Sequence, residues 1–348
     1  MNPYVLTTLL SSLGLGTTLT FASSHWLLAW MGLEINTLAI IPLMAQHHHP
    51  RAVEATTKYF LTQATAAAMI LFASTTNAWM TGEWDLNNMS NPIASTMIIT
   101  ALALKIGLAP MHFWMPEVLQ GLDLMTGLIL STWQKLAPLA LIIQTAQAID
   151  PLLLTTLGLM STLIGGWGGL NQTQLRKILA YSSIAHMGWM IIILQYTPQL
   201  TLLALGTYIF MTSAAFLTLK MSSTTKISTL AMTWSNSPIL ATTTALVLLS
   251  LGGLPPLTGF MPKWLILQEL TKQNLPISAT IMALAALLSL YFYLRLCYAM
   301  TLTISPNTIN STTSWRIQTT QTSLPLTISI TIALGLLPMT PAILMLAT

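Results

Sequence analysis

Four ionisable residues stand inside segments that are otherwise apolar. Glu34 lies in LLAWMGLEINTLAII, Lys105 in ALALKIGLAP, Lys135 in TWQKLAPL and Lys263 in LTGFMPKW. A charge near the centre of a bilayer costs roughly 2.5–3.5 kcal/mol, so such charges are paired or hydrated and usually mark an ion path. A lysine suits proton carriage because desolvation without a partner lowers its pKa by several units, whereas arginine stays protonated. These four residues therefore predict a path for protons.

The composition is that of a polytopic membrane protein. Of the 348 residues, 54% are apolar and only 6% are charged, and the mean hydropathy is +0.71. Globular domains have about 25% charged residues. The net charge of +4 comes without any cluster of basic and aromatic residues, so nucleic-acid binding is not expected. Cys297 is the single cysteine, which excludes an intrachain disulfide and a cysteine-ligated iron–sulfur site.

Apolar runs of about 20 residues, enough to cross a core of about 30 Å, predict an all-α fold of about eleven transmembrane helices. The alternation typical of membrane strands is missing from the sequence. The predicted spans are residues 3–21, 25–45, 58–80, 93–120, 124–146, 152–170, 175–194, 200–219, 238–270, 276–300 and 324–347.

Three of the four charges lie near the middle of their spans. At a rise of 1.5 Å per residue, Glu34 is about 13 Å from the start of its span, Lys105 about 18 Å and Lys135 about 16 Å. The other cations fall almost entirely on one side if the spans alternate. This bias predicts an N-terminus on the inner side and a C-terminus outside. The inner side would carry Arg51, Lys58, Arg176, Lys177, Lys220, Lys226, Arg295 and Arg316, and the outer side only Lys272.

Two spans, 93–120 and 238–270, are too long and are interrupted by proline and glycine. Paired broken helices at matching places in two halves are typical of repeat-built transporters, and FWMPE (113–117) resembles FMPKW (260–264). We therefore predict one transmembrane domain over residues 1–348, with repeat halves at about 3–146 and 152–300 and a C-terminal helix at 324–347. The predicted helix breaks are at Pro110, Pro116, Pro255, Pro256 and Pro262.

Other polar residues are weaker candidates. His112 and His186 lie near the predicted path and could support a proton relay, although a buried histidine is often only a hydrogen-bonded core residue. Glu117 and Glu269 lie toward helix ends, where they either give protons access to the path or are simply solvated. The tract at 47–49, three histidines, follows a helix end and is read as an interfacial loop, so no metal site is predicted.

The segments LLAWMGLEINTLAIIPL, LKIGLAPMHFWMPEV, TWQKLAPL, YSSIAHMGWM and SLGGLPPLTGFMPKW together resemble the NADH dehydrogenase subunit 2 family of mitochondrial respiratory complex I. The resemblance covers essentially the whole chain, and the family is antiporter-like. It implies two inverted five-helix bundles, each with a discontinuous helix. Longer members begin with three additional helices, and this chain starts at what would be the fourth.

The resemblance also implies roles for the buried residues. Glu34 would pair with Lys105, Lys135 would connect the two halves, and Lys263 would end the path, with His112 and His186 along the same axis. The chain would be a proton-translocating membrane-arm subunit of NADH:ubiquinone oxidoreductase in the mitochondrial inner membrane. It would contact other membrane-arm subunits, including neighbouring antiporter-like ones, and membrane lipids.

The sequence contains no nucleotide fingerprint, cysteine cluster or flavin site. We therefore expect no redox centre and no cofactor on this chain, with flavin, iron–sulfur clusters and ubiquinone in partner subunits. Two alternatives stay open. A stand-alone cation/proton antiporter would work without redox partners, and a structural scaffold of the membrane arm would tolerate neutral residues in place of the buried lysines.

Overall fold

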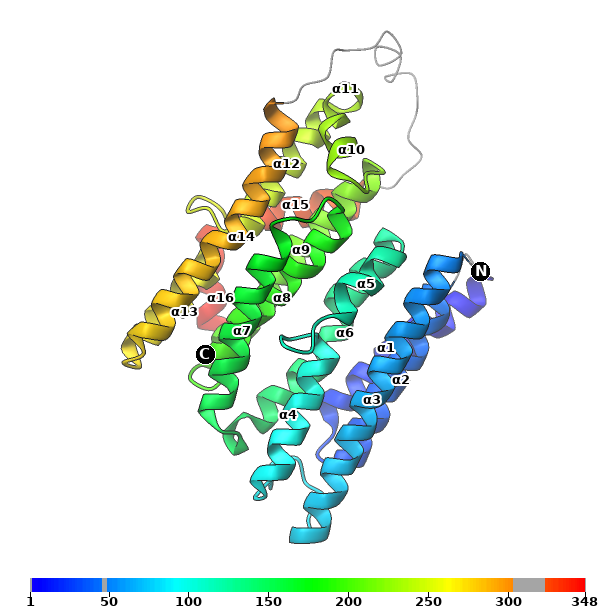
Figure 1. Ribbon diagram of the computed structural model, residues 1–348, viewed down its shortest axis with the longest axis vertical. Coiled ribbons are helices and arrows are strands. Elements are labelled where there is room, and N and C mark those ends of the chain that lie inside the picture. The colour runs from blue at the N-terminus through cyan, green and yellow to red at the C-terminus, as the bar shows by residue number, and fades with distance from the viewer. Residues whose placement is uncertain (1, 46–48, 303–322, 348) are drawn as a thin grey trace. The chain divides into compact units, whose positions relative to one another are not determined.

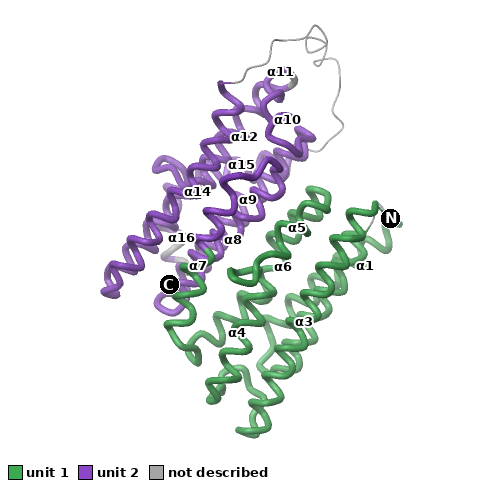
Figure 2. Tube along the Cα trace, in the orientation of Figure 1, with its two compact units in different colours: residues 1–161 green, residues 162–348 purple. Residues whose placement is uncertain are grey.

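The computed structural model describes residues 2–45, 49–302 and 323–347, and all regular structure within these ranges is helical. The chain divides into two compact units, Met1–Ser161 and Thr162–Thr348 (Figure 2). Helix α7 (Pro151–Gly169) crosses the boundary between them. The described residues confirm the predicted all-α fold.

Unit 1 is a bundle in which α3 and α6 are the central helices. Helix α3 packs against α2, α4 and α5, and α6 packs against α1, α2 and α4 (Figure 1). The helices are α1 (Pro3–Ala22), α2 (Trp26–Met44), α3 (Pro50–Thr81), α4 (Pro92–Ile106), α5 (Trp114–Gly121) and α6 (Leu124–Thr145), followed by the short 3-10 helix η1 (Ala146–Ala148).

Unit 2 repeats this packing with its own helices. Helix α9 packs against α8, α12 and α13, as α3 packs against α2, α4 and α5, and α14 packs against α8 and α12, as α6 packs against α2 and α4. The helices are α8 (Leu175–Ile193), α9 (Pro198–Met221), α10 (Ile227–Ala231), α11 (Thr233–Asn236), α12 (Pro238–Gly252), α13 (Phe260–Lys272), α14 (Pro276–Leu302), α15 (Leu324–Gly335), the 3-10 helix η3 (Leu337–Met339) and α16 (Thr340–Ala347).

The same sequence signals begin and end the broken helix of each unit. Helices α4 and α12 both begin with a proline, where the missing N–H is not needed, and both have 15 residues. Gly107 and Gly253 follow them with φ of 84° and 83°, a left-handed conformation that glycine adopts without strain. Each glycine N–H bonds back to carbonyl groups three and four residues earlier. The two glycines lie 146 residues apart, as do the initial prolines Pro92 and Pro238.

Some prolines of the two breaks lie in the connections between helices, and others lie in the first turn of the next helix. Pro110, Pro255 and Pro256 lie in the non-helical connections, as predicted for helix breaks. Pro116 and Pro262, by contrast, are the third residues of α5 and α13. The prediction that they break a helix is wrong, because the first N–H groups of a helix have no intrahelical acceptor and proline loses nothing there.

The eleven predicted spans coincide with eleven helices or helix pairs: α4 with α5, α12 with α13 and α15 with α16 form the pairs. By length and composition alone, six described helices can cross a membrane, or seven if α15 and the bent helix after it count as one span. Helix α3 begins at Pro50, eight residues before the predicted span, so Arg51 and Lys58 are helical rather than in a loop. Pro50 at the first position and the His49 side chain, which accepts a hydrogen bond from the Arg51 N–H, explain this early start. Arg316 lies outside the described residues.

Candidate functional site

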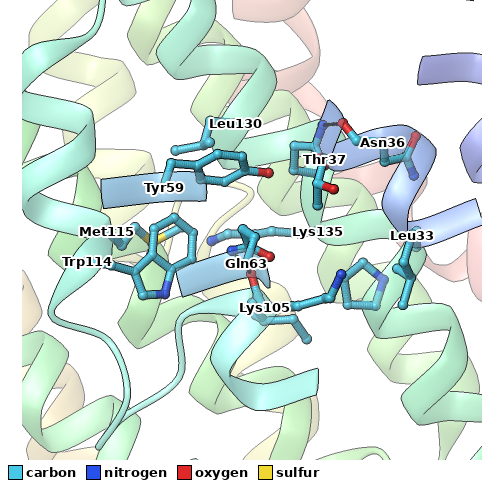
Figure 3. Close-up of a pocket in the computed structure, with 14 residues that line it drawn as sticks. Leu33, Asn36, Thr37, Tyr59, Gln63, Lys105, Trp114, Met115, Leu130 and Lys135 are labelled. Atoms are coloured by element: carbon cyan, nitrogen blue, oxygen red, sulfur yellow. Dashed lines mark hydrogen bonds between the residues drawn. The ribbon is translucent and has the colours of Figure 1, made fainter. Parts of the chain in front are cut away.

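Lys105 and Lys135 line one cavity in unit 1. The cavity has a volume of about 10 Å³, which is room for about one water molecule, and its walls come from α2, α3, α4, α5 and α6. Figure 3 shows the two lysines and Gln63 gathered between the rings of Tyr59 and Trp114 on one side and Leu33, Asn36 and Thr37 on the other. The structure therefore brings together two of the predicted residues from different helices.

The Lys105 ammonium group is buried without a hydrogen-bond acceptor among the residues that the structure describes. Lys105 lies in the last turn of α4, and the carbonyl groups freed at this helix end are taken by other donors. The Trp114 indole N–H donates to the Leu104 carbonyl at 3.0 Å, and the Gln63 amide donates to the Lys105 carbonyl at 3.5 Å. The helix end is thus capped while the lysine side chain faces the cavity.

Lys135 lies in the middle of α6 and is 2% exposed. Pro138, in the next turn of the same helix, cannot donate a backbone N–H to the Gln134 carbonyl. The Gln134 amide itself donates to the Asn36 carbonyl of α2 at 3.2 Å. This bond and the proline fix the part of α6 that carries Lys135 against α2.

Glu34 is half-buried one turn from the cavity. Its carboxylate accepts a hydrogen bond from the Thr37 hydroxyl at 3.0 Å, and within the described parts of the chain it makes no ion pair with Lys105. Its charge still interacts electrostatically with both Lys105 and Tyr59. Glu34 is therefore a neighbour of the lysine site rather than a direct partner of Lys105 in this structure.

Lys263 lies in a second cavity, in unit 2. Its ammonium group donates to the Gly252 carbonyl at the end of α12 at 2.8 Å. This carbonyl, at a helix C-terminus, carries part of the negative end of the helix dipole. His186 from α8 lines the same cavity, together with Ser182, Trp189, Ser289 and Tyr293. The His186 ring also packs against Tyr208 of α9, with centroids 5.6 Å apart.

The remaining predicted residues lie apart from the two cavities. His112 is buried in the break between α4 and α5, where its Nδ1 is 3.2 Å from the Pro110 carbonyl oxygen, and it does not line the Lys105 cavity. Glu117 pairs at 2.8 Å with Lys58, which also pairs with Glu54. Glu269 pairs with Lys272 at 2.6 Å.

The structure describes only one of the three histidines in the predicted interfacial loop. His47 and His48 lie outside the described residues, and His49 caps α3. Among the residues that are described, no three His, Cys, Asp or Glu side chains gather as metal ligands.

Tyr59, Gln63 and Trp114 are among the residues of the unit 1 cavity that the sequence-based prediction did not name. Tyr59 and Gln63 are four residues apart, so they share one face of α3 and form a short polar stripe towards the cavity. That spacing was a usable signal in the sequence. The role of Trp114 was not, because it depends on how the chain folds back after Gly107.

The fold and the site define a class: a polytopic membrane protein built from repeats, with lysines buried beside broken helices. The chain belongs to the NADH:quinone oxidoreductase/Mrp antiporter transmembrane family, whose model matches residues 23–289. The model of the NADH dehydrogenase subunit 2 C-terminus matches residues 290–344.

Similar sequences and solved structures support this family assignment. The chain is 87% identical to NADH-ubiquinone oxidoreductase chain 2 of Cyprinus carpio, over 100% of both chains. A chain in a structure of respiratory complex I from Thermus thermophilus is 28% identical, with a TM-score of 0.84, covering 97% of this chain and 78% of that one. A chain in a structure of the Mrp complex from Dietzia shares the fold at 15% identity and a TM-score of 0.84, covering 97% of this chain and 76% of that one.

Proposed function

We propose that this chain is a proton-translocating subunit in the membrane arm of NADH:ubiquinone oxidoreductase. The observation that carries the proposal is the Lys105 ammonium group, which is buried without an acceptor in a cavity that it shares with Lys135. An ammonium group held in this way costs several kcal/mol. Ionisable residues inside a membrane are therefore usually functional. For Lys105 that function is to gain and lose a proton.

Electrostatics then suggests the order of events. While the ionised Glu34 is near, it favours the protonated form of Lys105. When the two separate, desolvation favours release of the proton toward Lys135 and then Lys263, because two neighbouring ammonium groups disfavour each other. His112 and His186 support this route, and Glu117 and Glu269 give protons access to it or exit from it.

The setting of the chain follows from the same proposal. Oxidation of NADH and reduction of ubiquinone take place in partner subunits, which hold the flavin and the iron–sulfur clusters. The protein is a multi-pass protein of the mitochondrial inner membrane and contacts lipids and other membrane-arm subunits, including antiporter-like ones. The cation bias supports an N-terminus on the matrix side and a C-terminus on the intermembrane-space side. With five spans in each repeat half (about 3–146 and 152–300), alternation inverts the second half, and the helix at 324–347 follows.

Two substitutions test the proposal in the assembled complex. Lys105→Met removes the titrating group, and Glu34→Gln removes the charge that favours its protonated form. Both should lower proton pumping together with coupled quinone reduction. Wild-type pumping in both variants would reject the relay and leave a scaffold role. Cation-dependent proton flux by the purified chain alone in liposomes would instead favour a stand-alone antiporter.

A further inference from the structure

Tyr59 is a buried polar residue of the unit 1 cavity that the route above does not use. It lines the cavity with Lys105 and Lys135 and is 2% exposed. Its hydroxyl group has no hydrogen-bond partner among the described residues. The hydroxyl oxygen is not fully enclosed by protein atoms, because it faces the cavity, which has room for about one water molecule. The hydroxyl group can therefore exchange hydrogen bonds with such a water, which a phenylalanine ring could not do.

The ring of Tyr59 has a fixed place. Its centroid is 5.8 Å from that of Trp114, at an interplanar angle of 60°, and the Trp114 indole is itself held by the Leu104 carbonyl. In Figure 3 the hydroxyl end of Tyr59 is directed toward Thr37. Thr37 donates its own hydrogen bond to the Glu34 carboxylate, whose charge acts on Tyr59 as well as on Lys105. The hydroxyl group thus lies on the Thr37 side of a cavity that Lys105 and Lys135 also line.

Unit 2 contains the same layout at equivalent positions. Tyr59 and Tyr208 are 149 residues apart on the corresponding helices α3 and α9, and the same interval joins Glu34 on α2 to Ser183 on α8. In unit 2 the tyrosine hydroxyl makes a side-chain hydrogen bond with Ser183. The repeat therefore relates a buried tyrosine to a polar residue of the preceding helix twice, through a hydrogen bond to Ser183 in unit 2 and through the charge of Glu34 in unit 1.

We propose that Tyr59 is a further residue of the proton path, whose hydroxyl group links Glu34 and Thr37 to Lys105 and Lys135. This inference rests on the proposed function. In the step, the phenol oxygen accepts a proton from a lysine ammonium, directly or through the one water that the cavity can hold. At the same time its own O–H proton passes on to the next acceptor. One N–H bond breaks, one O–H bond forms as another breaks, and the acceptor gains the proton, so the tyrosine ends neutral.

The test is Tyr59→Phe in the assembled complex, because this change deletes one oxygen and keeps the ring. Proton pumping and coupled quinone reduction should fall about tenfold or more, since a positioned proton carrier contributes roughly 10²–10⁴-fold. The solvent hydrogen-isotope effect on turnover should also rise, which a merely structural role would not cause. Tyr4→Phe, at a position that is 79% exposed, is the matched control and should behave as wild type.

Thr37→Val gives a second readout. If Thr37 and Tyr59 lie on one route, the double variant should be scarcely slower than the slower single variant. Activity of Tyr59→Phe equal to that of Tyr4→Phe, or independent effects of the two changes, would overturn the proposal. Lys105→Met distinguishes a failure of the Tyr59 role from a failure of the proposed function. If Lys105→Met is impaired while Tyr59→Phe is not, only the role of Tyr59 fails, and if Lys105→Met pumps normally the proposed function itself fails.

Discussion

The broken helices of the two units end on equivalent left-handed glycines, but their freed carbonyl groups are bound by different donors. In unit 1 the neutral indole of Trp114 takes the Leu104 carbonyl, and the Lys105 ammonium has no acceptor. In unit 2 the Lys263 ammonium group caps the end of α12, since it donates a hydrogen bond to the Gly252 carbonyl. The same backbone design thus leaves one buried ammonium group without an acceptor and gives the other a carbonyl acceptor.

Replacing each lysine by methionine should give the largest contrast. Lys105→Met removes a buried charge without an acceptor and should raise stability by about 1–4 kcal/mol. Lys263→Met also removes a buried charge, but it leaves the Gly252 carbonyl without its donor, at a cost of about 1–3 kcal/mol. The thermal denaturation midpoint of the assembled complex should therefore rise in the first variant and not in the second. Equal shifts would remove the distinction between the two sites.

Alanine at the two glycines sharpens the comparison. Both changes force an alanine into the left-handed region, which costs about 1–2 kcal/mol. At Gly253 the new Cβ would also lie 2.9 Å from the Lys263 Nζ, whereas at Gly107 its nearest neighbours are at 3.4 Å. Gly253→Ala should therefore destabilise more and also displace Lys263 from Gly252, visible in a structure of the variant. An equal loss of stability at both positions would show that the ammonium group is easily moved.

Trp114→Phe should have a smaller effect. The ring remains, and the Leu104 carbonyl loses the indole donor but keeps the bond from the Gly107 N–H at 3.2 Å, so the cost should be about 1 kcal/mol, the net value of one hydrogen bond. The comparison variant is Trp79→Phe, at a position that is 88% exposed on α3. We expect a lower denaturation midpoint for Trp114→Phe alone. If both variants melt as wild type does, the indole does not cap α4.

The ion pairs at the surface should contribute least. The hydrogen bond from Lys58, and then its charge, lower the pKa of Glu54 from its ordinary value of 4.5. A lowered carboxyl pKa stabilises the fold above about pH 4.5, and this stabilisation is lost as the pH falls below that value. Because these side chains are solvated, Glu54→Gln should differ only slightly from wild type at pH 7, and the difference should vanish near pH 3. A difference that grows on acidification would contradict this sign.

Sequence reasoning found the helices and the buried lysines because both leave a strong signal. A span needs about 20 apolar residues, and Lys105, Lys135 and Lys263 stand out in such runs. It placed the start of α3 too late because Arg51 and Lys58 look like loop residues, although Pro50 begins the helix. It misread Pro116 and Pro262 because a proline that starts a helix and one that breaks it look the same in an apolar run.

The acceptors of the lysines could not be predicted in this way. Lys105 precedes its break and Lys263 follows its break, but whether either ammonium group meets a carbonyl depends on how the chain turns within the break. Tyr59 and Gln63 were within reach, because their spacing on α3 places them on one face. They were missed because a tyrosine and a glutamine carry no charge and so do not stand out in an apolar segment.

The most direct test of a proton route through this chain is the number of protons pumped per NADH oxidised by the reconstituted complex that carries Lys105→Met. Lys220→Met is the control, because it removes the same charge from an exposed helix end. We predict that the ratio falls for Lys105→Met and is unchanged for Lys220→Met. An unchanged ratio in both would contradict a role for the buried lysines in moving protons.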